Sequence, residues 1–386
     1  GGPFMLSVKG SSRVERHDVL VGEVWFASGQ SNMDMRMRGN TNQPIFGSNE
    51  AILHANNKRI RLFTAERQYS EEPMADAVGE WFPATPAAVK EFSAVGWFFA
   101  EKIEKLVDVP VGIISSAWGG SNVESWIDAD TLTAYEHLTF REATAGEPER
   151  RTPSLMYNGM LHPFLGYGIR GVIWYQGESN RSRPEEYLEL FPAMVDSWRR
   201  QWGIGDFPFY YVQIAPKDWD DGNSAFLREA QLMAMSAMTN AGMAVSLDIG
   251  ECDQIHPAEK HTVADRLAYW ALAQDYGFDA VGFSGPVYRE METTADGKAV
   301  LRFDHAPRGL TSFGQDLAGF EIAGADRVFH PAQAAIAKRE VTVTVWSEDV
   351  LEPVAVRYAF EDCPPATLFN TEGLPASSFR TDNWPD

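Results

Sequence analysis

The 386-residue chain is poor in basic residues. Its 33 Lys and Arg residues stand against 54 Asp and Glu residues, which gives a formal net charge of −21. Proteins that bind nucleic acid or anionic membranes do so through clustered Lys and Arg side chains, and the sequence contains no such cluster. The composition therefore argues against nucleic acid and membranes as partners and favours a neutral or mildly cationic one.

Cysteines and long apolar runs are scarce as well. Cys252 and Cys363 are the only cysteines, so a disulfide framework is excluded, and whether these two form a single bridge stays open. No apolar run approaches the roughly 20 residues that a membrane-spanning helix needs, and no signal peptide is recognisable. The chain opens with Gly1-Gly2-Pro3-Phe4, from which we expect a truncated or processed amino terminus.

Apolar and aromatic residues, in contrast, are well represented. They make up 44% and 12% of the chain, respectively, which predicts a well-packed globular protein. A chain of 386 residues exceeds the usual size of one domain. We therefore expect one large core with a smaller appended domain.

Short apolar runs alternate with segments of helical periodicity between residues 18 and 282, which we predict to be one catalytic domain. The apolar runs span residues 19–27, 111–115, 171–175, 209–214 and 243–249, and the helical segments span residues 92–107, 184–202, 224–239 and 257–276. This alternation predicts a parallel sheet in a doubly wound α/β fold, whose ligands bind beyond the carboxyl ends of the strands. Residues 35–90 form an insertion in which the pattern does not locate helices.

Two β-rich segments flank this domain. Residues 4–9 alternate between apolar and other side chains, so residues 1–17 are interpreted as a remnant strand of an amino-terminal β domain whose partners lie elsewhere. After residue 282 the helical periodicity disappears, and short alternating runs cover residues 299–303, 317–322, 341–346 and 354–358. Residues 283–386 are therefore predicted to form a β-sandwich-like domain.

A candidate nucleophile, Ser31, follows the first apolar run in the segment Gly29-Gln30-Ser31-Asn32-Met33. A serine in such a stretch is more often a turn or helix-cap residue. To act as a nucleophile it needs an imidazole to take its proton and an acceptor that orients the imidazole. His256 and Asp253 could supply both from one loop, and Glu251 is a rival acceptor.

Two other loops at strand ends offer groups that could stabilise an oxyanion. Gly119 and Gly120 follow the second apolar run, and glycines allow a backbone amide to approach a reacting centre closely. Gln176 carries its side-chain amide at the end of a buried run, where an unpaired polar group would be unfavourable. An oxyanion would be a suitable acceptor for it.

The four loops together resemble a known superfamily. The motifs Gly-Gln-Ser-Asn-Met, Trp-Gly-Gly, Trp-Tyr-Gln-Gly-Glu-Ser-Asn and Ile-His-Pro, in this order, are similar to those of SGNH hydrolases, and more narrowly to the sialate O-acetylesterase family and related carbohydrate acetylesterases. The resemblance implies a flavodoxin-like three-layer α/β/α hydrolase domain with flanking β domains. It also implies serine esterase chemistry without a metal or cofactor.

The resemblance assigns roles to the candidate residues. Ser31 would be the nucleophile and His256 the general base, and the Ser31 amide, a Gly119 or Gly120 amide and Gln176 would donate to the oxyanion. Asp253 is the expected partner of His256, with Glu251 or a backbone carbonyl as alternatives.

The implied substrate is an acetylated sugar or glycan, and the implied location is secreted or periplasmic. Sugar contacts are expected from residues in the same loops: Gln30, Asn32, Trp118, Asn122, Glu178, Asn180 and Trp219. Glu178 could instead organise its loop from a buried position, and aromatic residues are often core residues. Arg181 or Arg183 could meet the carboxylate of a sialic acid.

Other functions stay open on the residues alone. The chain could be an acetylxylan or acetylxyloglucan esterase of the same fold, or an inactive relative that only binds glycans. A glycosidase would pair Glu178 with another carboxylate. A metal site built from Cys252, Asp253, His256 and His261 is a further alternative, although their spacing matches no common zinc pattern.

Overall fold

A seven-stranded sheet forms the centre of the protein. The computed structural model describes residues 1–138, 149–337 and 341–384, and the sheet has the order β5-β4-β6-β3-β7-β8-β9. Strand β5 is antiparallel to β4, and the other neighbouring strands are parallel. The strands are β3 (Glu23–Gly29), β4 (Asn57–Thr64), β5 (Trp81–Ala84), β6 (Val111–Ala117), β7 (Gly171–Tyr175), β8 (Phe209–Val212) and β9 (Ala241–Ala244).

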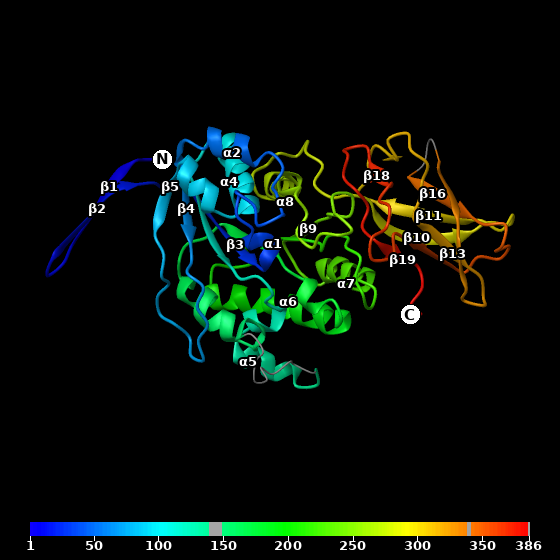
Figure 1. Ribbon diagram of the computed structural model, residues 1–386, viewed down its shortest axis with the longest axis horizontal. Helices are drawn as coiled ribbons and strands as arrows, with labels where there is room; N and C mark the ends of the chain where they lie inside the picture. Colours follow the sequence, from blue (N-terminus) through cyan, green and yellow to red (C-terminus); the bar gives the residue numbers. More distant parts are fainter. Residues whose placement is uncertain (139–148, 338–340, 385–386) are drawn as a thin grey trace.

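Helices cover both faces of this sheet (Figure 1). Helices α4 (Ala94–Val107) and α8 (Lys260–Asp275) pack on one face, and α6 (Pro184–Trp202) and α7 (Ala225–Ser236) pack on the other. Because successive strand residues point to opposite faces, Trp25 of β3 belongs to the first core and its neighbour Phe26 to the second. The layers confirm the predicted α/β/α fold class.

The long helices lie where the periodicity predicts them, with ends that differ by at most three residues. The remaining α-helices are short: α1 (Ser31–Asp34), α2 (Ser48–His54), α3 (Pro86–Glu91) and α5 (Ala129–Leu132). Single turns of other helix types are η1 (Val123–Trp126), η2 (Thr133–Tyr135), η3 (Glu149–Arg151), η4 (Tyr157–Leu161), η5 (His162–Phe164) and η6 (Glu178–Asn180). None of the helices in the described residues is both long and apolar enough to span a membrane.

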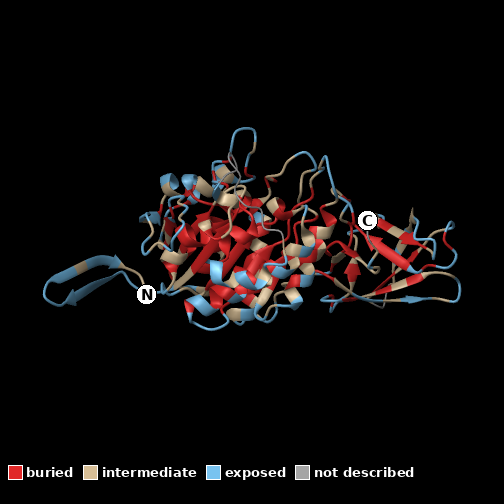
Figure 2. Ribbon diagram, turned by 90° about the horizontal axis from the view of Figure 1, so that it is seen from below, coloured by how far each residue is buried: buried red, intermediate tan, exposed pale blue. Residues whose placement is uncertain are grey.

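Two sequence predictions at the amino-terminal side are wrong. The run 19–27 is not one strand, because β2 (Arg13–Val19) ends and a turn precedes β3. The strand at residues 4–9, β1 (Phe4–Lys9), is not isolated, since it pairs antiparallel with β2. The resulting hairpin projects from the body of the protein and is mostly exposed (Figures 1 and 2). A larger amino-terminal β domain stays a prediction.

The carboxyl-terminal part contains two four-stranded antiparallel sheets, ordered β10-β11-β16-β15 and β14-β13-β17-β19. Both contribute to the apolar core that also contains Phe26 of the α/β domain. Their strands are β10 (Val287–Thr293), β11 (Ala299–Asp304), β13 (Phe320–Ala323), β14 (Phe329–Pro331), β15 (Gln333–Ile336), β16 (Thr342–Trp346), β17 (Ala355–Tyr358) and β19 (Phe379–Arg380), beside the pair β12 (Leu310–Thr311) and β18 (Phe369–Asn370).

Buried polar contacts join this β domain to the α/β domain. Arg228 of α7 has no exposed surface, and its guanidinium donates to Ser378 Oγ at 2.9 Å and to the backbone carbonyls of Glu361 and Asp362. Gln213, also fully buried, donates to Ser377 Oγ at 2.7 Å. Because a buried charge needs acceptors, the guanidinium of Arg228 depends on the docked β domain.

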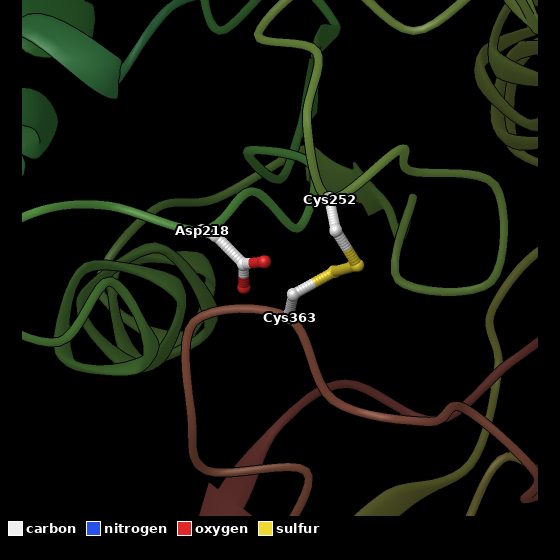
Figure 3. A group of neighbouring side chains, drawn as sticks. All are labelled: Asp218, Cys252 and Cys363. Carbon is white, nitrogen blue, oxygen red and sulfur yellow. A yellow bond between two sulfur atoms is a disulfide. The ribbon is translucent and has the colours of Figure 1, made fainter.

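A disulfide joins the same two domains. Cys252 lies between β9 and α8, Cys363 lies between β17 and β18, and the two are 111 residues apart in sequence. Figure 3 shows Asp218 beside the bridge, and the Asp218 amide donates to the Cys252 carbonyl at 2.8 Å. The two cysteines, whose pairing the sequence left open, therefore form a single disulfide. Since Cys252 has no thiolate to offer, the alternative metal site loses one of its expected ligands.

We expect the disulfide to stabilise the fold substantially. Cross-linking residues 111 positions apart removes loop entropy from the unfolded chain, an effect on the order of 4 kcal/mol. A double variant, Cys252→Ser with Cys363→Ser, should lower the free energy of unfolding by up to this amount in denaturant titrations. A reducing agent should destabilise the wild type and leave the double variant unchanged. Equal unfolding midpoints for oxidised and reduced wild-type protein would contradict the expectation.

Candidate active site

Ser31 lies at the carboxyl end of the central strand β3. The strand ends at Gly29, where φ is 131° and a Cβ atom would lie 2.2 Å from the Tyr175 carbonyl oxygen, so only glycine fits. The Gln30 amide then donates to this same carbonyl at 2.9 Å, and α1 begins at Ser31. In the first turn of a helix the amides have no intrahelical acceptor. The Ser31 amide is therefore available to an incoming group.

The glycine loop after β6 packs directly against Ser31. The Trp118 amide donates to the Gly29 carbonyl at 3.1 Å, and a Cβ atom on Gly119 would lie 3.2 Å from Ser31 Cβ. The Gly119 amide also faces the Asp34 carboxylate. Burial raises the pKa of Asp34, although Arg67 and the Gly119 amide act in the opposite direction. Gly119 therefore packs against Ser31, and its predicted role as an oxyanion donor stays a prediction.

Gln176 is buried at the end of β7, and its side-chain amide is already engaged. Nε2 donates to Asn180 Oδ1 at 2.7 Å and to the Ser121 carbonyl at 3.2 Å. An amide nitrogen has two hydrogens, and these contacts use both. The geometry gives no support to Gln176 as an oxyanion donor, so that role stays a prediction.

Asn122 and Asn180, two of the expected sugar contacts, meet at a buried carboxylate instead. The side-chain amides of Asn122 and Asn180 donate to the two oxygens of Glu124 at 2.9 and 2.8 Å. Glu124 is fully buried and also pairs with Arg183. The sequence analysis did not single out Glu124. These side chains brace the loops after β6 and β7 and do not support the predicted sugar contacts.

Gln30 has a comparable internal role. Its side chain is buried, and Oε1 accepts hydrogen bonds at 3.4 Å from the amides of Gly177 and Ser179. It therefore joins the loop after β3 to the loop after β7.

Asn32 connects the serine loop to the histidine loop. Its Nδ2 donates to Glu178 Oε1 at 2.7 Å and to the Ile255 carbonyl at 3.0 Å, and its Oδ1 accepts from Lys260 Nζ at 2.7 Å. We call this set, Asn32 with Glu178, Lys260 and the Ile255 carbonyl, the Asn32 junction. Since Asn32 follows Ser31 and Ile255 precedes His256, the junction holds the loops of Ser31 and His256 side by side.

His256 is oriented by an amide from the insertion. Its Nδ1 lies 2.9 Å from Gln43 Oε1, and because an amide oxygen can only accept, Nδ1 must carry the hydrogen. Nε2 is then the unprotonated nitrogen that a general base requires. Burial, together with the charge of Lys260, lowers the pKa of His256 to about 4. The imidazole is thus neutral at physiological pH.

The carboxylates expected behind His256 lie elsewhere. Asp253 is exposed, and no contact joins it to His256 in the described part of the chain. Glu251 accepts from the Ala258 amide at 2.7 Å, which braces the loop and does not reach the imidazole. The structure therefore offers Gln43, and not Asp253, Glu251 or a backbone carbonyl, as the partner of Nδ1.

The two tryptophans expected to stack on sugar are differently placed. Trp118 is half-buried and packs against the core. Trp219 has the Arg181 guanidinium 4.3 Å and the Lys217 ammonium 4.5 Å from its ring centre, so cations already lie over it. Arg181 also pairs with Asp221 at 2.7 Å. A sugar would have to displace one of these cations to stack on Trp219.

A cavity beside α1 offers room for a ligand. It has a volume of about 350 Å³ and lies at the carboxyl ends of β4 and β6. Asp34, the last residue of the helix that begins with Ser31, lines it together with Arg67. The two side chains form an ion pair at the edge of the cavity.

Known proteins resemble the chain over most of its length. A family model described as "Carbohydrate esterase, sialic acid-specific acetylesterase" matches residues 21–272. A sialate O-acetylesterase from Mus musculus is 29% identical and covers 98% of this chain and 82% of its own length, and one from Homo sapiens is 31% identical and covers 76% and 62%, respectively. The crystal structure of a carbohydrate acetylesterase from Xanthomonas citri superposes with a TM-score of 0.89 at 39% identity, covering all of this chain and 86% of that one.

The contact at His256 Nδ1 predicts a difference between two variants. Gln43→Ala should lower kcat for 4-nitrophenyl acetate by roughly 10-fold or more, because the imidazole loses the acceptor that fixes its tautomer. Asp253→Ala, a matched change in the same part of the site, should leave kcat within about twofold. A loss in Asp253→Ala with full activity in Gln43→Ala would return the orienting role to the carboxylate.

Proposed function

The chain belongs to the carbohydrate esterase family described as sialic acid-specific acetylesterases, and we propose that it hydrolyses acetyl esters on sugar hydroxyls through Ser31 and His256. It is a carbohydrate O-acetylesterase, as its relatives are. The proposal adds the residues that perform the reaction and the kind of sugar that they meet.

The observation that carries the proposed mechanism is the Asn32 junction. One amide side chain, next to Ser31 in sequence, donates at 3.0 Å to the carbonyl of the residue before His256. A covalent serine mechanism requires the nucleophile and its base to lie within reach of each other. The neutral imidazole, with Nδ1 held by Gln43 at 2.9 Å, supplies a base in the required tautomer.

The reaction proceeds in two half-reactions. Ser31 Oγ attacks the acetyl carbonyl carbon while His256 Nε2 takes its proton, and the Ser31 amide donates to the oxyanion. Nε2–H then protonates the sugar oxygen as its bond to the acyl carbon breaks. In the second half, Nε2 takes a proton from water, which attacks the acetyl-serine, and the same proton returns to Ser31 Oγ as acetic acid leaves and then ionises in solvent. Atoms and charge balance without an added co-reactant.

We propose an O-acetylated sialic acid as the first substrate, with its sugar ring next to the cavity at α1. Arg150 supports a substrate with a carboxylate. A Cβ atom on Gly120 would lie 2.9 Å from Arg150 Nε, and this buried nitrogen has no hydrogen-bond partner among the described residues. A guanidinium beside the glycine loop suits a carboxylate.

Acetylated xylan or xyloglucan is the second candidate. Arg181 and Arg183, which the sequence suggested for a substrate carboxylate, pair with Asp221 and Glu124, so they favour a neutral sugar. The disulfide supports a secreted or periplasmic location, because such bonds persist in oxidising compartments.

Acetate release from the two substrate classes tests the proposal. Wild-type protein should release acetate from O-acetylated sialic acid faster than from acetylated xylan or xyloglucan. Ser31→Ala and His256→Ala should each lose nearly all activity, because the nucleophile and its base act as a unit. Arg150→Gln should reduce the rate only on the sialic acid.

Activity of Ser31→Ala equal to that of the wild type would refute the mechanism. A wild-type preference for xylan or xyloglucan, unaltered in Arg150→Gln, would instead retain the mechanism and replace the substrate.

A further inference from the structure

We propose that Lys260 is a positioning residue of the esterase reaction: its buried ammonium fixes the Asn32 amide between the two catalytic loops. This inference rests on the proposed roles of Ser31 and His256. It concerns how these two residues are held and how far into the acid range the base stays functional.

The contacts of Lys260 place it between the catalytic loops. It is the first residue of α8 and has no exposed surface. Nζ donates to Asn32 Oδ1 at 2.7 Å and to the Pro257 carbonyl at 2.8 Å, and it lies 5.7 Å from the centre of the Tyr175 ring. One ammonium therefore binds the residue after Ser31 and the residue after His256.

The charges around Asn32 determine which way its amide points. Its oxygen faces the ammonium of Lys260, and its nitrogen faces the carboxylate of Glu178 at 2.7 Å. The opposite orientation would set the amide N–H groups against a cation and the amide oxygen against an anion. Only the observed orientation lets Nδ2 also reach the Ile255 carbonyl. The cation and the anion thus act on the catalytic geometry through one neutral side chain.

Burying the ammonium is unfavourable in itself. A methionine of similar volume would fill the space without desolvating a charge, and buried ion pairs often stabilise a fold less than apolar residues do. Burial lowers the pKa of Lys260 to about 7, although the carboxylates of Glu178, Glu251 and Glu259 act against this shift. A lysine at this position therefore does little for the stability of the fold, and its role lies in the geometry of the site.

The environment of His256 combines one cation with one neutral hydrogen-bond partner. Lys260 is the charged group that acts on its pKa, after burial, and Gln43 contacts Nδ1 at 2.9 Å. Glu251 is nearby in sequence but accepts from the Ala258 amide. Removing the charge of Lys260 should therefore let His256 protonate at a higher pH, and a protonated imidazole cannot act as a base.

The test is the pH dependence of kcat/KM for 4-nitrophenyl acetate in the wild type, Lys260→Gln and Lys260→Met. The wild type should keep its plateau rate at pH 5.5, a pH at which an ordinary histidine would be mostly protonated. Both variants should shift the acidic limb upward by about one unit or more. The kcat should fall by on the order of 10-fold in Lys260→Met and less in Lys260→Gln, which can still donate to Asn32.

Lys102→Met is the matched control. Lys102 of α4 pairs at 2.7 Å with Asp265 of α8, the helix that begins with Lys260. Its replacement should not alter the pH profile of kcat/KM. Circular dichroism at each pH verifies the fold. The inference would be overturned if the acidic limb of Lys260→Gln coincided with that of the wild type. It would also be overturned if the wild-type limb lay near pH 6.5, and this result can be read even where Lys260→Met does not fold. Activity in Ser31→Ala would instead overturn the mechanism on which the inference rests.

Discussion

The contact between the loop of Ser31 and the loop of His256 depends on the hydrogen bonds of one buried amide, Asn32. Ser31 and His256 come from opposite ends of the α/β domain in sequence. Asn32 donates to the Ile255 carbonyl and the Glu178 carboxylate and accepts from the Lys260 ammonium. Because the side chain is fully buried, water does not compete for these partners. The rest of the site is arranged around this fixed point.

Much of the fold, and the edge of the sheet at which Ser31 and His256 lie, could be predicted from the sequence. Strands buried on both faces leave continuous apolar runs, and the loops that follow parallel strands lie at the same edge of the sheet, as the loops of Ser31 and His256 do. The strand β4 was missed because its charged residues, Lys58, Arg59 and Arg61, interrupt the apolar pattern. Apolar periodicity indicates which residues are buried, and β4, which lies near the edge of the sheet, is only partly buried.

The supporting residues were beyond such reasoning. Gln43 meets His256 across 213 positions of sequence, and nothing distinguishes it from other amides in a polar insertion. A different difficulty arises for the residues predicted to contact sugar, such as Asn122, Asn180 and Glu178. A polar residue after a strand has the same sequence pattern whether its side chain faces a ligand or another loop. Burial separates the two cases, and burial is known only when all loops are in place. Glu124 was invisible for this reason.

The contacts of Arg228 have a consequence for how such an enzyme can evolve or be engineered. Its guanidinium belongs to the α/β domain, yet it donates to Ser378 and to the carbonyls of Glu361 and Asp362 in the β domain. Replacing the β domain with an unrelated one would remove these acceptors and leave the cation with Ser224 Oγ of its own domain at 3.0 Å. The two domains are therefore not interchangeable modules. Selection and recombination must act on them as one inherited unit.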